Sequence, residues 1–185
     1  YIGGVSGGLM PVPMLNILNG GAHAASNVDV QEFMVMPHGF DTFEAGLRAG
    51  VETYHSLKRE LKQDGLLGGV GDEGGFAPNL PANEEGLKYM VRAIEGAGYS
   101  TEEMGIALDV AATEFFHGEQ YHIDGKKLTS EELSNLYSGW LDEYPILSIE
   151  DGFAEDDWRG WSNFTKKEGH RVQTVGDDLF VTQSQ

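Results

Sequence analysis

The sequence predicts an α/β protein built on a largely parallel sheet, and three observations support that fold class. Short apolar runs without alternation recur along the chain, as expected for strands that are buried on both faces. From Gly105 onward, segments with helical spacing of apolar residues lie between these runs. Hydrophobic residues make up 40% of the chain and charged residues 23%, a composition that supports a packed core.

Five strands are predicted from the apolar runs, at residues 12–18, 33–36, 106–110, 146–149 and 172–175. They suit either an open sheet or part of a barrel. A complete eight-stranded β/α barrel typically takes about 250 residues, with ~200 as the lower end. The 185 residues are therefore too few to close one. Because the first residue is Tyr1 and no signal peptide precedes it, we expect this chain to be a piece of a longer protein.

Four helices are predicted, at residues 41–62, 83–95, 129–144 and about 155–167. The first is expected to use Asp41 as its N-cap, because Glu44 follows it at capping-box spacing. Apolar residues recur along this helix at helical spacing. They are Leu47, Val51, Tyr54 and Leu61.

The later helices carry clear start and stop signals. Gly96 and Gly98 end the second, and a Thr129-x-x-Glu132 capping box begins the third. The fourth has three acids in its expected first turn and two lysines in its last, an order that complements the helix dipole. Its aromatic residues recur every three positions and are interpreted as a core face. They are Trp158, Trp161 and Phe164.

Residues 117–127 predict a β-hairpin insertion, because Gly118 and Asp124-Gly125 supply turn signals between short polar strands.

Charge and composition exclude several classes of function. Acidic residues outnumber basic ones by 30 to 12, which gives a net charge of −18. Such a surface repels phosphate backbones, so binding to nucleic acid or to anionic membranes is disfavoured. No run of 18 apolar residues exists to span a bilayer. Cysteine is absent, which excludes disulfides, thiolate zinc sites and cysteine nucleophiles, and a cytoplasmic location fits that absence.

Each of the three later predicted strands ends in a carboxylate, at Asp109, Glu150 and Asp177. In parallel α/β folds the carboxyl ends of the strands form the active-site face. A single acid there is most simply a cap for the next helix or turn, but three at equivalent positions favour a metal site. Buried together, they would resist ionisation without a cation. Oxygen-only ligands favour Mg²⁺ before Mn²⁺ or Ca²⁺.

Two glycine-rich loops are less specific. Residues 68–75 hold Asp72 and Glu73 among five glycines, which could let the backbone approach a ligand while presenting Glu73. A tight surface turn explains the same composition equally well. His23, after Gly20-Gly21, could titrate near neutral pH or bind an anion, although a loop histidine is more often incidental.

Taken together, these segments resemble the enolase family, specifically its bacterial members. The motifs follow the family's order and cover essentially the whole chain. They are residues 10–16, 19–23, 30–34, 70–75 with 77–79, 108–109, 114–116, 148–152 and 176–182. One departure is Thr113, where the family more often has serine.

The resemblance implies a fold and an activity. The family has a small α+β domain followed by an eight-stranded TIM (β/α)8 barrel that opens with two adjacent strands and two helices. Residues 1–185 would be an incomplete C-terminal barrel domain with about the first five strands, the N-terminal domain and the end of the barrel lying outside it. The implied whole protein is a glycolytic lyase that reversibly dehydrates 2-phosphoglycerate to phosphoenolpyruvate with Mg²⁺. It would be a cytoplasmic homo-oligomer, a dimer or larger, with the cell surface or secretion as a second location.

The resemblance also implies roles for matching residues. The ligands of the conformational Mg²⁺ would be Asp109, Glu150 and Asp177. The catalytic pair would be Glu73, which protonates the departing hydroxyl, and Glu32, which supports it. The substrate-binding residues would be His23, Gln31, Glu32, Glu150 and Asp177.

The family's base lysine and its phosphate-binding cluster match positions beyond Gln185, so these 185 residues alone are expected to be inactive. Two other readings remain open. One is a different Mg²⁺-dependent lyase or racemase of the enolase superfamily, which the glycine-rich loop around Glu73 disfavours. The other is a surface protein that binds plasminogen or matrix, which the scarcity of basic residues disfavours.

Overall fold

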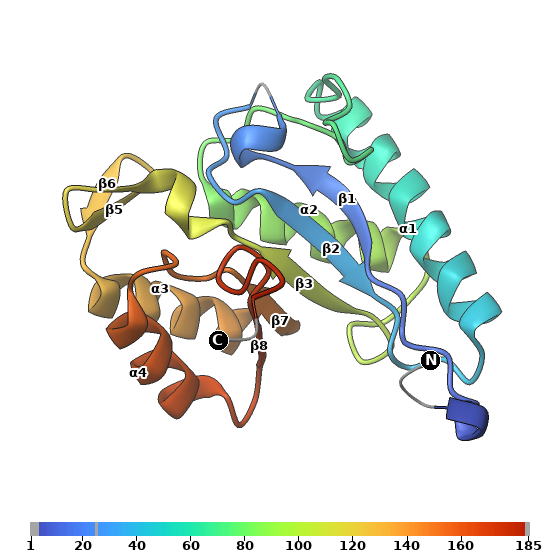
Figure 1. Ribbon diagram of the computed structural model, residues 1–185. Coiled ribbons are helices and arrows are strands. Elements are labelled where there is room, and N and C mark those ends of the chain that lie inside the picture. Colours follow the sequence, from blue (N-terminus) through green and yellow to red (C-terminus); the bar gives the residue numbers. More distant parts are fainter. Residues whose placement is uncertain (1–3, 25, 184–185) are drawn as a thin grey trace.

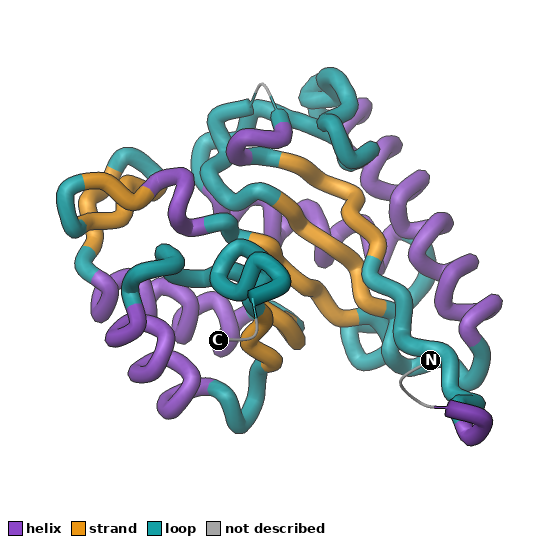
Figure 2. The backbone as a smooth tube through the Cα atoms, in the orientation of Figure 1, coloured by secondary structure: helices purple, strands orange, loops and turns teal. Residues whose placement is uncertain are grey.

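The computed structural model describes residues 4–24 and 26–183, without the side chain of His23. Its main sheet has five strands in the order β1-β2-β3-β7-β8 (Figures 1 and 2). The strands are β1 (Leu15–Asn19), β2 (Glu32–Met36), β3 (Gly105–Asp109), β7 (Ile146–Glu150) and β8 (Gln173–Val175). All five predicted strands are therefore present, although the first begins three residues later than the sequence indicated.

The sheet is parallel in its later half only. β2 pairs antiparallel with both β1 and β3, whereas β3, β7 and β8 pair parallel. In the part of the chain that is described, β1 and β8 are the two edges, so the sheet is open. The strand order is that of a barrel that has not closed, and it agrees with the predicted partial barrel.

Four helices cover this sheet. They are α1 (Phe43–Gln63), α2 (Asn83–Gly96), α3 (Ser130–Glu143) and α4 (Trp158–Glu168). α1 and α2 follow β2 in succession and pack against each other, with α2 behind the sheet in Figure 1. α3 and α4 each precede a parallel strand, β7 and β8. The order of two strands, two helices and then alternating strands and helices is the one that the family resemblance implied.

Close helix–sheet contacts depend on glycine at two positions. A Cβ on Gly50 of α1 would lie 2.7 Å from the Leu15 side chain of β1. A Cβ on Gly86 of α2 would lie 2.7 Å from the Phe33 ring of β2. Because these distances are shorter than van der Waals contact, a larger residue would require the Leu15 or Phe33 side chain, or the helix itself, to shift.

The start and the buried face of α1 differ from the prediction. Thr42, not Asp41, is the N-cap, and its hydroxyl accepts a hydrogen bond from the Ala45 N–H at 3.1 Å. Leu47 and Val51 are exposed. The buried face is made mostly of small residues, namely Gly46, Ala49, Gly50, Thr53, Ser56, Leu57 and Leu61. Helical periodicity of large apolar residues misidentified this face because close packing on the sheet selects small side chains.

The fourth helix is shorter than predicted. It begins at Trp158, and the carboxylate of Asp157 caps it by accepting from the Gly160 N–H at 2.9 Å. The acids that were expected in its first turn therefore precede the helix. Trp161 and Phe164 are buried as predicted, but Trp158 is 63% exposed, so the three aromatic residues do not share one core face.

The predicted hairpin is a three-stranded sheet. Its strands are β4 (Phe116–His117), β5 (Gln120–Ile123) and β6 (Lys126–Leu128). Two-residue turns join them at residues 118–119 and 124–125, and both residues of each turn have positive φ. Such turns match the right-handed twist of the strands and favour glycine and aspartate.

Glu168 is a buried acid that ties α3 to α4. Its carboxylate accepts hydrogen bonds from the Ser138 hydroxyl at 2.6 Å and from Arg171 Nε at 2.5 Å. Arg171 also pairs with Asp142 of α3 at 2.7 Å. The hydrogen bond from Arg171 lowers the pKa of Glu168 below its usual value, despite the opposing effect of burial.

We expect Glu168→Gln to destabilise the protein by about 1–3 kcal/mol at neutral pH. A folded-state pKa below the unfolded value of about 4.3 stabilises the protein above that value, and the contribution is lost as pH falls through the folded pKa. Urea unfolding of the wild type and of Glu168→Gln between pH 7 and pH 3 should therefore show that the difference in their free energies of unfolding becomes smaller as the pH falls. The exposed Glu95 of α2 provides a control, because Glu95→Gln should change little at any pH. A pH-independent difference for Glu168→Gln would contradict this prediction.

The β8 edge bears an apolar groove. A cavity of about 520 Å³ lies between α4 and the end of the sheet, lined by residues that include Trp158, Val175 and Phe180. An open strand edge next to exposed apolar side chains promotes association.

We therefore expect the 185 residues, produced by themselves, to self-associate. Light scattering after size exclusion should give a mass that rises with concentration, and Trp158→Glu should reduce that rise by placing a charge in the groove. A monomer mass at every concentration would contradict it.

Candidate active site

Residues at the ends of four neighbouring strands form one row across the sheet, namely the last residues of β1, β3 and β7 and the first residue of β2. Asn19 pairs with Glu32, Glu32 with Asp109, and Asp109 with Glu150. Residues that pair directly across strands point to the same face of a sheet. The fold therefore collects three carboxyl groups side by side, from β2, β3 and β7. The sequence predicted this for Asp109 and Glu150, but it gave no geometric reason to add Glu32.

Glu32 is the most buried acid of this row. Burial raises its pKa to about 9, and a hydrogen bond with the Glu73 carboxyl and the charges of Glu73, Asp109 and Glu150 act in the same direction. The raised pKa favours one retained proton on the Glu32–Glu73 pair, in the hydrogen bond between the two carboxyl groups, as in other carboxyl pairs held close together.

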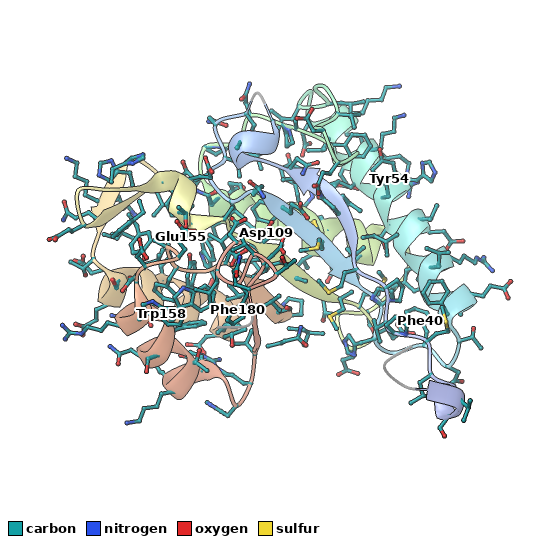
Figure 3. The ribbon with its side chains drawn as sticks, viewed as in Figure 1. Phe40, Tyr54, Asp109, Glu155, Trp158 and Phe180 are labelled. Atoms are coloured by element: carbon teal, nitrogen blue, oxygen red, sulfur yellow. The ribbon has the colours of Figure 1, made fainter. Side chains whose placement is uncertain are left out.

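Asp109 ends β3 and is held from two sides. Gln31 Nε2 donates to its Oδ2 at 3.0 Å, and the Ala111 N–H donates to its Oδ1 at 3.2 Å. Burial raises the pKa of Asp109 to about 6, although these two hydrogen bonds act in the opposite direction. Figure 3 labels Asp109 near the middle of the molecule, beside the turn that carries Phe180.

Glu150 ends β7 in the same row. Its pKa is raised to about 7, first by burial and then by the negative charges of Asp109, Asp151, Asp177 and Asp178. Four other acids thus raise the pKa of this carboxyl group through their negative charge.

The sequence predicted Asp177 at the end of a strand, but it lies in the turn that follows β8. Its backbone N–H donates to both carboxylate oxygens of Asp151 at 3.2 Å. Asp151 had no role in the predicted site. The sequence signal that could have pointed to it is its position directly after Glu150. The structure thus adds an acid that binds backbone rather than a ligand.

The glycine-rich loop at residues 68–75 packs on the end of β1. A Cβ on Gly71 would lie 2.8 Å from the Asn19 side chain, and one on Gly75 would lie 2.3 Å from its Oδ1. These two glycines therefore make room for a buried asparagine, which is a more specific role than approach to a ligand. Glu73, at the loop tip, is exposed and accepts from Asn16 Nδ2 at 3.5 Å. The loop brings Glu73 to Glu32, which the sequence order alone could not indicate.

A second set of hydrogen bonds holds the loop before β2. The Asn83 side chain, which is fully buried, accepts from the backbone N–H groups of Asp29 and Val30 at 2.8 and 2.9 Å. It also donates to the carboxylates of Asp29 and Asp124, at 2.8 and 2.7 Å. This network joins the loop, α2 and the three-stranded insertion just before Gln31. Sequence patterns missed it because its members are far apart in the chain.

His23 lies in a 3-10 turn, Gly21–His23, directly after β1. The turn begins at the same end of the sheet as the row of acids. The side chain of His23 is outside the part of the chain that the structure describes, so its predicted role stays a prediction.

The donor set fits a hard divalent cation. Asp109, Glu150 and Asp177 offer oxygen atoms alone, and burial and then neighbouring negative charges disfavour ionisation of Asp109 and Glu150 unless positive charge is added. As the side chains stand, no three histidines or acids among residues 4–24 and 26–183 are close enough together to hold an ion. Joint binding of Mg²⁺ by these three acids stays a prediction.

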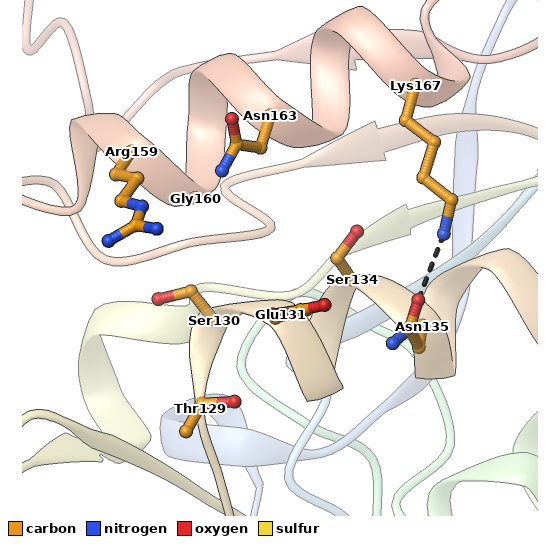
Figure 4. A pocket seen from close by; sticks show the side chains of 9 residues that line it. All are labelled: Thr129, Ser130, Glu131, Ser134, Asn135, Arg159, Gly160, Asn163 and Lys167. Atoms are coloured by element: carbon orange, nitrogen blue, oxygen red, sulfur yellow. Dashed lines mark hydrogen bonds between the residues drawn. The ribbon is translucent and has the colours of Figure 1, made fainter.

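The groove in Figure 4 lies apart from this row. It has a volume of about 630 Å³ and lies between α3 and α4, with Arg159 and Lys167 among its lining residues. Lys167 donates to Asn135 at 3.0 Å, and Ser130 donates to Asp157 at 2.5 Å. Because these polar groups bond to the protein itself, the groove is a weaker candidate site than the row of acids.

Comparison with known proteins identifies the relatives of this chain. Residues 8–185 match the family model described as "Enolase, C-terminal TIM barrel domain". The chain is 54% identical to a protein named "Enolase" from a Nitratiruptor species over 98% of its length, covering 44% of that protein. It is 51% identical to an "Enolase" from Natranaerobius thermophilus over 99% of its length, again covering 44% of the relative. The chain thus spans somewhat less than half the length of these curated relatives.

None of the helices in the described ranges is long and apolar enough to cross a membrane.

The repulsion around Glu150 leads to a test in metal-free buffer. Glu150→Gln should raise the melting temperature of the whole protein at pH 8, because it removes a negative charge from a partly buried acidic cluster. Added Mg²⁺ should raise the melting temperature of the wild type more than that of the variant, since a cation that binds only the folded state stabilises it. Differential scanning calorimetry with EDTA and then with Mg²⁺ measures both, and Glu95→Gln is the control. A lower melting temperature for the variant in EDTA would refute the repulsion.

Proposed function

This chain belongs to the enolase family, as part of its C-terminal TIM barrel domain, and on that premise we propose that the whole protein reversibly dehydrates 2-phosphoglycerate to phosphoenolpyruvate. The observation that carries the proposal is the row of carboxyl groups at the ends of β2, β3 and β7. Proton removal next to a carboxylate creates negative charge on oxygen, and such a reaction needs both positive charge and a proton donor.

We propose that Glu73 is the general acid that protonates the departing hydroxyl group and that Glu32 supports it. Two features favour this pair. Glu73 is exposed, so a substrate could reach it, and Glu32 is buried and hydrogen-bonded to it. Because burial and the neighbouring Glu73 raise the pKa of Glu32, the pair favours holding an acidic proton where the leaving group would need one.

The proposed ligands of Mg²⁺ are Asp109, Glu150 and Asp177. Bound there, the cation would supply positive charge opposite the carboxylate of the substrate. Gln31 orients Asp109 through its 3.0 Å hydrogen bond, and the Ala111 N–H holds the other oxygen of that carboxylate. We also propose that the substrate is bound by His23, Gln31, Glu32, Glu150 and Asp177. The base that removes the proton is proposed to be a lysine of the whole protein outside these residues.

The proposed setting follows from the same premise. The substrate is a small molecule, and we propose a cytoplasmic enzyme that assembles as a homo-oligomer. The net charge of −18 supports the absence of nucleic-acid and anionic-membrane partners. The two relatives named enolase, at more than 50% identity, disfavour a different lyase or racemase of the superfamily. Nothing specific favours a surface role in binding plasminogen or matrix.

In the whole protein, we expect Glu73→Gln to lower kcat by about 10²–10⁴-fold with little change in KM. The amide keeps the shape of the side chain but cannot supply an acidic proton. Exchange of the C2 proton of 2-phosphoglycerate with solvent should persist, because the base acts before the hydroxyl group leaves. Steady-state kinetics and exchange in deuterated water measure the two steps separately.

Glu95→Gln again serves as the control, since it makes the same chemical change on an exposed face of α2 and should leave kcat within about twofold. Loss of both exchange and turnover in Glu73→Gln would assign Glu73 to proton removal instead. Phosphoenolpyruvate formation by the 185 residues alone would mean that a base lies within them.

A further inference from the structure

Asp151 occupies an unusual position at the carboxyl end of the sheet. It follows Glu150 directly, and it is only 3% exposed. Its backbone has φ of 44°, in the left-handed region that aspartate and asparagine tolerate better than most residues. A buried acid in such a conformation persists only where its surroundings hold it.

The backbone of Asp151 joins the ends of three strands. Its N–H donates to the carbonyl oxygen of Val175, the last residue of β8, at 3.0 Å. Its carbonyl oxygen accepts from the N–H of Ala112, just beyond β3, at 2.9 Å. Asp151 itself follows the last residue of β7. The main chain at this residue therefore locks the end of β7 to its neighbours on both sides.

The side chain of Asp151 organises the turn after β8. Its two carboxylate oxygens accept from the N–H groups of Asp177, Asp178 and Leu179 at 2.9–3.3 Å. Three successive backbone donors thus converge on one carboxylate. An ionised carboxylate offers only acceptors, so it can satisfy all three, whereas an amide would direct N–H groups at some of them.

We propose that Asp151 is the positioning residue for Asp177. By gathering these three N–H groups, its carboxylate holds the turn that carries Asp177 at the carboxyl end of the sheet, and this arrangement sets the affinity of the site for a divalent cation. The inference rests on the proposed function, because it takes Asp177 to be a ligand of the cation. Groups that orient metal ligands typically change metal affinity by 10–100-fold when they are mutated.

Calorimetric titration of the metal-free whole protein with Mg²⁺ tests the inference. Asp151→Asn keeps the size of the side chain and its tolerance of positive φ, but it replaces an acceptor with a donor. We expect its Kd for Mg²⁺ to rise by about 10–100-fold. Turnover should recover as Mg²⁺ is raised, because the defect lies in binding the cation; a loss that no Mg²⁺ concentration restores would overturn a positioning role.

Asp157 offers a matched control. Its carboxylate also accepts a backbone hydrogen bond, from Gly160 at 2.9 Å, and others from the hydroxyl groups of Tyr121 and Ser130. It caps α4 rather than the turn that carries Asp177. Asp157→Asn should lower the melting temperature yet leave the Kd for Mg²⁺ within about twofold. If Asp151→Asn and Asp157→Asn weakened Mg²⁺ binding equally, the role of Asp151 would be one of general stability and the inference would be overturned.

Asp151→Gly covers the case in which the asparagine variant does not fold. Glycine adopts positive φ without strain but has no carboxylate, so it should lose Mg²⁺ affinity while keeping the backbone path. Wild-type affinity in either Asp151 variant would overturn the inference.

Asp177→Asn separates this result from failure of the proposed function. If that variant binds Mg²⁺ normally, Asp177 is not a ligand and the site assignment fails together with the inference. If it binds weakly while the Asp151 variants bind normally, the inference alone fails.

Discussion

Repulsion among acids at the ends of neighbouring strands is the constraint on which the rest of this site depends. Strand pairing sets Glu32, Asp109 and Glu150 in one row, and Asp177 lies in the turn after β8. Burial first, and then the charge of nearby acids, raises the pKa of the three row acids to about 9, 6 and 7 in that order. Such a cluster favours compensation, either a proton held by the Glu32–Glu73 pair or a bound cation. The proposed chemistry uses both.

Groups that carry no net charge, or that bind backbone, hold these acids in place. Gly71 and Gly75 make room for the Asn19 side chain beneath the loop of Glu73. Asn83 binds the backbone just before Gln31, which in turn holds Asp109. Because these supports add no further acid to the row, they position the carboxyl groups without increasing their repulsion. Asp151 is the exception, and three backbone N–H groups offset its charge.

The helices show where sequence patterns succeed and where they do not. The predicted capping box at Thr129 is confirmed. Sequence patterns could find it because both of its hydrogen bonds lie within four residues. The prediction of the buried face of α1 was wrong, because Gly50 and its small neighbours pack closely on the sheet while Leu47 and Val51 are exposed. Periodicity detects apolar side chains but not the distance between a helix and the sheet that it covers.

The sequence by itself determined the α/β class, the five strands, the four helices and the acids at the strand ends, because hydrophobic patterns and caps are local. The family motifs added the expected order of the barrel. Only the tertiary structure decided that Glu32 joins the row, that Glu73 reaches it and that Asp151 holds the turn of Asp177. The contact of Asp151 with the Asp177 turn spans 26 residues, and the pairing of Glu32 with Asp109 joins residues still farther apart in the chain. Their geometry depends on strand register and on close backbone approach, and local sequence patterns predict neither.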